Sequence, residues 1–181
     1  YHGASNKIQE KNFKIAFSKS HNEVALDQKG NAGIRYLLEG LINFNSEIRN
    51  IDLTKAGRIA DDLIMILGPT VDFDLEELDR LEEFLLSGGK LFVALDPDFK
   101  TENLENLRRF LADWGFKVRR DVVVDKMSTI EGVDASVIVT KKFNKQHVIT
   151  KDFQGRILFP LSSSIQLTGK NNQTAFANSI D

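Results

Sequence analysis

The sequence LIMILGPTVDFDLEELDRLEEFLLSGGKLFVALDP, residues 63–97, contains two short apolar runs separated by an acidic amphipathic segment. The runs at 63–67 and 90–95 have the length and composition of strands. The first of them is uninterrupted, as in a strand that is covered on both faces. The segment between the runs has the period of a helix. Strand, helix and strand in this order predict a parallel pair with a right-handed crossover, and therefore an α/β domain.

The helix between the two strands is specified at both ends. Asp74 has the position of an N-cap, and Glu77 at the third helical position completes a capping box. Phe73 and Leu78 occupy the two positions of a hydrophobic staple. Gly88 supplies the left-handed residue that ends the helix. The buried stripe is expected to consist of leucines at helical spacing: Leu75, Leu78, Leu81 and Leu85.

The same rhythm continues on both sides of this unit. Alternation at 13–17 and 47–53 predicts two earlier strands, with a helix over 34–42 between them. A later helix is expected to begin near Thr101 and to end at Gly115, followed by a fifth strand over 116–124. We therefore expect a doubly wound, mostly parallel sheet of the flavodoxin-like or amidotransferase-like kind.

The alternation of helix and strand stops after Asp125. Short strand-like segments at 136–140, 146–150 and 156–159 are separated by turn-forming residues, as in an antiparallel extension. The expected organisation is a flexible N-terminal segment at 1–12, an α/β domain at 13–125 and a β-rich extension of the same domain at 126–181.

Composition excludes several classes of function. The net charge is −2 over 181 residues, so no strong overall field recruits nucleic acid or an anionic membrane. The absence of cysteine excludes thiol catalysis, thiolate zinc sites and disulfides. No apolar run approaches the roughly 20 residues that span a bilayer. Short basic pairs such as Lys141-Lys142 are usually solvated.

Polar residues follow the first strand, at the edge of a parallel sheet where ligands usually bind. Residues after the third and fourth strands are expected at the same edge. Together they predict a binding rim that consists of Ser20, His21, Asn22, Glu23, Gly68, Pro69, Asp96 and Pro97.

Catalytic, metal and cofactor sites are not expected on this rim. Ser20, His21 and Glu23 are the residue types of a hydrolase triad, but adjacent residues rarely converge as nucleophile, base and orienter. Helix capping and the helix dipole explain the carboxylates that surround the helix start at 72–77. The sequence contains neither a dinucleotide-binding fingerprint nor a Walker motif.

Several motifs resemble a known family: ILGP after the third strand, DLEEL at the helix start, FLLSGGKL at its end and LDP after the fourth strand. The similarity continues through 110–116 and the DVVVD segment at 121–125. In these motifs the chain resembles the soluble domain of the GldG-like auxiliary components of ABC-type transport systems, some of which are linked to gliding motility. Near Ser20 the family often has Gly-His-Gly-Glu, where this chain has SHNE at 20–23.

The resemblance implies a non-catalytic, periplasmic domain that is tethered to the inner membrane by flanking transmembrane helices absent from this sequence. Such a domain assists an ABC transporter through protein contact or ligand sensing. The implied partners are membrane or ATPase-associated subunits of the transporter, and a homo-oligomer is also open; no nucleic acid is expected. Two alternatives of other classes remain: a hydrolase or amidotransferase-like enzyme with Ser20 as nucleophile, and a small-molecule binding module that uses the crevice.

Overall fold

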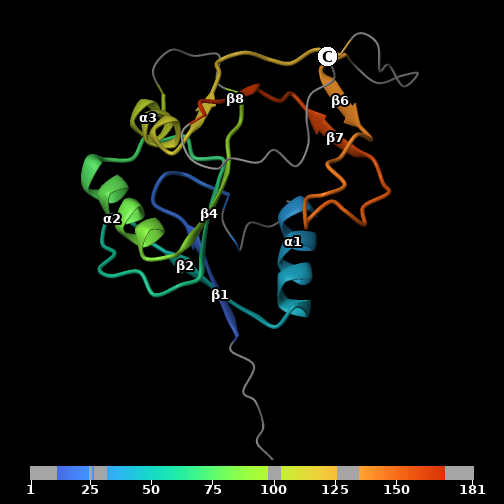
Figure 1. Cartoon of the computed structure of the whole chain (residues 1–181). Helices are drawn as coiled ribbons and strands as arrows, with labels where there is room; N and C mark the ends of the chain where they lie inside the picture. The colour runs from blue at the N-terminus through green and yellow to red at the C-terminus, as the bar shows by residue number, and fades with distance from the viewer. Residues whose placement is uncertain (1–11, 25, 27–31, 98–102, 126–134, 170–181) are drawn as a thin grey trace, which may run out of the picture. The chain divides into compact units, whose positions relative to one another are not determined.

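The computed structural model describes residues 12–24, 26, 32–97, 103–125 and 135–169 (Figure 1). The chain divides into two compact units, Tyr1–Ala94 and Leu95–Asp181. Thr101 and the expected N-terminal segment up to residue 11 lie outside the described residues. No helix in the described ranges is both long and apolar enough to cross a membrane.

The first unit contains a four-stranded sheet in the order β2-β1-β3-β4. The strands are β1 (Phe13–Ser18), β2 (Ser46–Ile51), β3 (Leu63–Leu67) and β4 (Lys90–Ala94). All three strand pairs are parallel, and Ile64 of β3 lies opposite Leu91 of β4. The predicted α/β fold is therefore confirmed, including the parallel pair formed by the two apolar runs of 63–97. The order of the four strands is the flavodoxin-like one.

Two helices pack against this sheet. Helix α1 (Ala32–Asn43) connects β1 to β2, and α2 (Leu75–Leu86) connects β3 to β4. The face of the sheet that carries Ile15, Phe17 and Met65 forms one hydrophobic core with α1. Figure 1 shows α2 on the other side of the sheet, where alternation along β3 directs Ile64 and Ile66. The sheet is thus covered from both sides, as the uninterrupted apolar sequence of β3 predicts.

The expected ends of α2 are confirmed, but its buried face is rotated from the expected one. Asp74 accepts a hydrogen bond from the Glu77 backbone N–H, and the Glu77 side chain accepts one from the Asp74 N–H. Leu78 and Leu81 are buried, whereas Leu75 is 66% exposed. The helix instead buries Glu77 and Phe84, which share a face with these two leucines. A carboxylate can occupy that face because its Oε2 finds two partners there, the Asp74 N–H and Nε2 of His21.

Two glycines of the first unit give opposite predictions on replacement by alanine. Gly40 lies inside α1 with open space around its missing side chain, so Gly40→Ala should raise the free energy of unfolding by about 0.5–1 kcal/mol. Gly88 has φ +96° and also faces open space, so Gly88→Ala should lower it by about 1–2 kcal/mol through backbone strain alone. Urea titrations measure the free energy of unfolding of both variants and of the wild type. Equal signs for the two substitutions would contradict the assigned helix end.

In the second unit, the described residues form one helix and two small antiparallel sheets. Its elements are α3 (Glu105–Asp113), β5 (Phe116–Val118), β6 (Val137–Thr140), β7 (Ile157–Pro160) and β8 (Ile165–Leu167). Strand β5 pairs with β8, and β6 pairs with β7. The additional antiparallel strands of the extension are therefore confirmed. The division of the chain at residue 125 remains a prediction, and strands from both sides of that position form the β5–β8 sheet.

The structure of the second unit differs from the sequence prediction at two expected strands. The expected fifth strand over 116–124 is shorter and antiparallel, so it does not extend the parallel sheet in the described part of the chain. Residues 146–150 form turns instead of a strand. The backbone N–H groups of Thr150 and Lys151 both donate to the His147 carbonyl oxygen. These local bonds replace the ladder that the apolar pair Val148-Ile149 would otherwise favour.

Asp121, which follows β5, accepts hydrogen bonds from Ser164, which precedes β8. This contact makes a pH-dependent contribution to the stability of the second unit. The hydrogen bond from the Ser164 hydroxyl, followed by that from the Ser164 N–H, holds the pKa of Asp121 below its ordinary value of 3.8. Folding thus favours the ionised form. Its contribution is complete above pH 3.8 and is lost as the pH falls through the lower pKa of the folded state.

We therefore expect Ser164→Ala to destabilise the second unit slightly at neutral pH and by less at about pH 3. The effect should be small and weakened by salt, because the Asp121 side chain is partly exposed. Urea midpoints of the wild type and the variant at both pH values provide the measurement. A difference that grows on acidification would contradict this assignment.

Candidate functional site

The loop after β1 is fastened to the neighbouring strands by backbone hydrogen bonds. The Val24 N–H donates to the Leu67 carbonyl oxygen at 2.9 Å. The His21 carbonyl oxygen accepts hydrogen bonds from the N–H groups of Thr70 (2.9 Å) and Val71 (3.3 Å). The loop therefore lies against the segment that leads from β3 into α2. This is the point between β1 and β3 where the strand order reverses and where open α/β sheets usually bind ligands.

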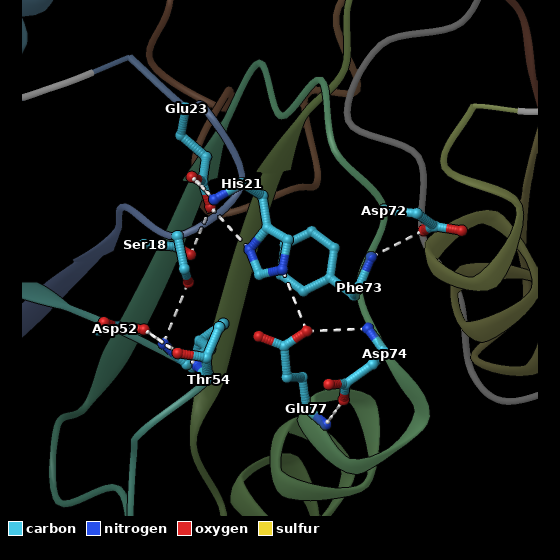
Figure 2. Close-up of polar contacts among 11 residues, drawn as sticks. Ser18, His21, Glu23, Asp52, Thr54, Asp72, Phe73, Asp74 and Glu77 are labelled. Carbon is cyan, nitrogen blue, oxygen red and sulfur yellow. Dashed lines mark hydrogen bonds and ion pairs between the residues drawn. The ribbon is translucent and has the colours of Figure 1, made fainter.

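The imidazole of His21 lies at the centre of the site. Its ring stacks on the Phe73 ring, with centroids 3.7 Å apart and planes inclined by 18°. Its Nε2 lies 3.1 Å from Oε2 of Glu77, the same oxygen that accepts the Asp74 N–H at the helix cap. Figure 2 shows these contacts around the start of α2. His21 is only 3% exposed, so it is part of the interior and does not line an open crevice.

Glu23 occupies the other side of the imidazole. Its Oε2 accepts the His21 backbone N–H at 2.6 Å, and its Oε1 accepts the Ser18 hydroxyl at 2.5 Å. The same Oε1 lies 3.5 Å from Nδ1 of His21, an ion-pair distance (Figure 2). The carboxylate of Glu23 thus lies between the hydroxyl of Ser18 and the ring of His21.

This arrangement is suited to holding the loop and not to nucleophilic catalysis. In a hydrolase triad the imidazole accepts the proton of the nucleophilic hydroxyl, and a carboxylate orients the imidazole from its far side. Here the Ser18 hydroxyl donates to a carboxylate, and Ser20 Oγ accepts the Leu53 N–H at 3.2 Å. Within the described part of the chain, neither serine is hydrogen-bonded to the imidazole of His21. The cluster joins β1, its loop and α2 through buried polar contacts.

Each ring nitrogen of His21 faces a carboxylate oxygen. An imidazolium donates from both nitrogens, whereas a neutral ring donates from only one. Nδ1 of His21 and Oε1 of Glu77 are buried without a hydrogen-bond partner among the described residues. The cluster is therefore close-packed but not fully satisfied. The ranges that the structure covers contain no group of three or more His, Asp or Glu side chains arranged to hold a metal.

The structure places the expected rim residues at very different depths. His21, Glu23 and Pro69 are buried, Ser20 and Gly68 are half-buried, and Asn22 is exposed with φ 57°. Gly68 has φ 61° and donates its N–H to the Ala94 carbonyl oxygen at 2.9 Å. Asp96 and Pro97 follow β4 and belong to the second unit. The eight-residue binding rim therefore remains a prediction.

Three residues of the cluster were not expected in it: Ser18, Phe73 and Glu77. A signal for two of them was present, because the capping box and the staple position Glu77 and Phe73 at the start of α2. A parallel sheet brings that helix start next to the loop after β1. Ser18 lies just beyond the strand predicted at 13–17, whereas the structure makes it the buried last residue of β1.

The chain thus forms an α/β domain with a parallel β2-β1-β3-β4 sheet and additional antiparallel strands. A buried polar cluster lies at the loop after β1. The chain belongs to the family described as "ABC-type uncharacterized transport system", which matches residues 12–178. This membership makes it an auxiliary component of an ABC-type transport system and is consistent with the GldG-like resemblance.

Solved structures share the fold. Five chains of known structure match, among them one titled "mmIFT52 N-terminal domain". That chain is 20% identical, superimposes with a TM-score of 0.70, and the match covers 86% of this chain and 69% of that one. At this identity the likeness shows the fold alone. No curated protein sequence matches.

Proposed function

We propose that this chain is a non-catalytic, extracytoplasmic domain that assists an ABC-type transport system through contact with transporter subunits. The family match over residues 12–178 carries the link to transport. The periplasmic location, the membrane tether and the absence of catalysis rest on the GldG-like resemblance. A domain of this kind needs a firm surface beside the membrane and no reacting group.

The buried cluster supports a contact surface over a reaction site. His21, Glu23 and Glu77 are each at most 9% exposed, and their contacts fasten the loop after β1 to the start of α2. Ligand sensing by these groups would require the loop to open first. A loop that is already held in one conformation loses little entropy when a partner protein binds.

Exposed apolar side chains at the start of α2 supply a candidate contact. Val71 and Leu75 are both exposed, and the backbone of Val71 is held by the His21 carbonyl oxygen. The fully buried core of a protein interface is more apolar than the rest of the surface, so exposed apolar groups on a fixed backbone fit such a core. We propose that Val71 and Leu75 contact a membrane or ATPase-associated subunit of the transporter.

Copurification with the transporter tests the contact. The intact protein is coexpressed with the subunits of the transport system encoded beside it, and the amount retained on the purified transporter is measured. Val71→Arg combined with Leu75→Arg should lower retention about tenfold or more, because charges replace apolar contacts. Leu86→Arg, an exposed site at the opposite end of α2, is the control for an added arginine outside this surface and should be retained like the wild type. Wild-type retention of the double variant would exclude this surface.

A reporter fusion tests the location separately. Alkaline phosphatase joined to the domain within the intact gene product should be active, because that enzyme matures only outside the cytoplasm. A fluorescent protein that folds only in the cytoplasm should stay dark at the same position. The reverse pattern would overturn the extracytoplasmic placement while leaving the contact with the transporter open to its own test.

A further inference from the structure

A loop in the second unit, residues 143–153, is closed by its own contacts. Phe143 and Phe153 meet edge to face at its base, with ring centroids 4.9 Å apart. The Thr150 hydroxyl donates to the Asn144 carbonyl oxygen at 2.7 Å, and Thr150 is buried. The Lys145 ammonium donates to the Phe153 carbonyl oxygen at 2.9 Å. The loop therefore has a defined conformation of its own.

The outermost part of this loop carries two large aliphatic side chains. Val148 and Ile149 are each 73% exposed. His147 holds them in this position, because its carbonyl oxygen accepts the N–H groups of Thr150 and Lys151, and its Nδ1 accepts the Ile149 N–H at 3.2 Å. Two adjacent β-branched residues on a fixed turn are the part of the loop that water solvates least well.

Basic residues flank this apolar tip in the sequence on both sides. Residues 141–156 contain five basic residues and one acidic residue, Asp152, in a chain whose net charge is −2. The five are all exposed: Lys141, Lys142, Lys145, Lys151 and Arg156. The local charge is thus opposite in sign to that of the whole protein, which explains why composition alone gives no indication of it.

We propose that residues 141–156 bind an anionic membrane surface, with Val148 and Ile149 inserted among the lipid headgroups. An exposed apolar tip in a segment of exposed basic residues matches such a surface, where aliphatic groups leave water and cationic groups meet phosphates. The inference rests on this loop alone and is independent of the proposed contact with a transporter.

Vesicle sedimentation tests the proposal. The protein should sediment with vesicles of phosphatidylglycerol and phosphatidylcholine in about a 1:2 ratio, and about tenfold or more weakly with phosphatidylcholine alone. Lys141→Gln with Lys142→Gln should weaken binding about 25-fold, since each lysine near an anionic surface contributes about fivefold. Val148→Ser with Ile149→Ser should weaken it about tenfold or more. Lys117→Gln in β5 is the matched control for lost charge and should bind almost like the wild type.

Site-specific fluorescence tests insertion directly, because the chain has no cysteine of its own. An environment-sensitive fluorophore on Ile149→Cys should shift to the blue when anionic vesicles are added, whereas the same label on Leu86→Cys should not shift. Unchanged emission at both sites would overturn insertion. Sedimentation that the Val148 and Ile149 substitutions leave unaltered would overturn it equally.

Discussion

Phe73→Ala is expected to lower the free energy of unfolding of the first unit by about 4 kcal/mol. The side chain is 1% exposed and stacks on the ring of His21. Its removal leaves a cavity beside a buried polar cluster, and the cluster cannot collapse into the space without breaking the contact between His21 and Glu77. Loss of transfer free energy and loss of packing therefore add. Urea unfolding followed by circular dichroism gives the free energy.

Phe44→Ala is the matched control for this prediction. Phe44 is 84% exposed directly after α1, so the same substitution should change the free energy of unfolding by no more than about 0.5 kcal/mol. Phe73→Leu should retain most of the volume and lose the ring stack, at a cost of about 1–1.5 kcal/mol. If the alanine variants at 73 and 44 lost equal stability, the stacked ring would not be part of the core.

Glu77→Ala is expected to have the second largest effect, a loss of about 3 kcal/mol. One oxygen of this buried carboxylate serves both the Asp74 N–H and Nε2 of His21. Truncation thus removes half of the capping box and leaves the buried imidazole without its partner on α2. An unsatisfied buried polar group costs more than the bond itself contributed. The same urea titration measures the change.

Two variants separate the buried role from a simple helix effect. Glu76→Ala removes the neighbouring carboxylate, which is exposed, and should cost only about 0.5 kcal/mol or less. Glu77→Gln retains an acceptor oxygen for both donors and should lose about 1 kcal/mol. Equal losses for the alanine variants at 76 and 77 would show that only the charge near the helix start matters, and would contradict the cluster.

Local sequence signals predict most of the first unit. The uninterrupted run LIMIL corresponds to β3, and the capping box formed by Asp74 and Glu77 marks the start of α2. Signals of this kind act within a few residues, so they can be read without knowledge of the rest of the chain. The parallel pairing follows from chain connectivity, because a helix that connects two neighbouring strands of one sheet forms a right-handed crossover between parallel strands.

The expected elements fail where a longer-range contact or a turn prevails. Periodicity predicts that Leu75 is on the buried face of α2, but Leu75 is exposed and Glu77 is buried instead. The reason is that His21, from another segment, supplies a partner for the Glu77 carboxylate. The VI pair at 148–149 has strand propensity, but turn bonds to His147 hold it in a loop. Strand β8 was missed because its three residues form a strand only opposite β5.

The candidate site shows the same division. Sequence indicates that residues 20–23 follow the first strand at the edge where ligands usually bind. The sequence does not show which of these residues are buried. In the structure His21 and Glu23 are buried, whereas Asn22 is exposed. Overall composition likewise averages the basic segment 141–156 with a more acidic remainder, and the sequence does not show that Val148 and Ile149 within it are exposed.

The sequence by itself determined the strand and helix positions of the first unit, the parallel sheet and the family, because capping, periodicity and chain connectivity are local or near-local properties. Only the tertiary structure decided that His21 lies between two carboxylates and against Phe73, and that Val148 and Ile149 face solvent. The physical reason is that burial and pairing depend on residues that are distant in the chain. Ser18, His21 and Glu23 meet Phe73 and Glu77 only after the sheet has brought the end of β1 beside the start of α2.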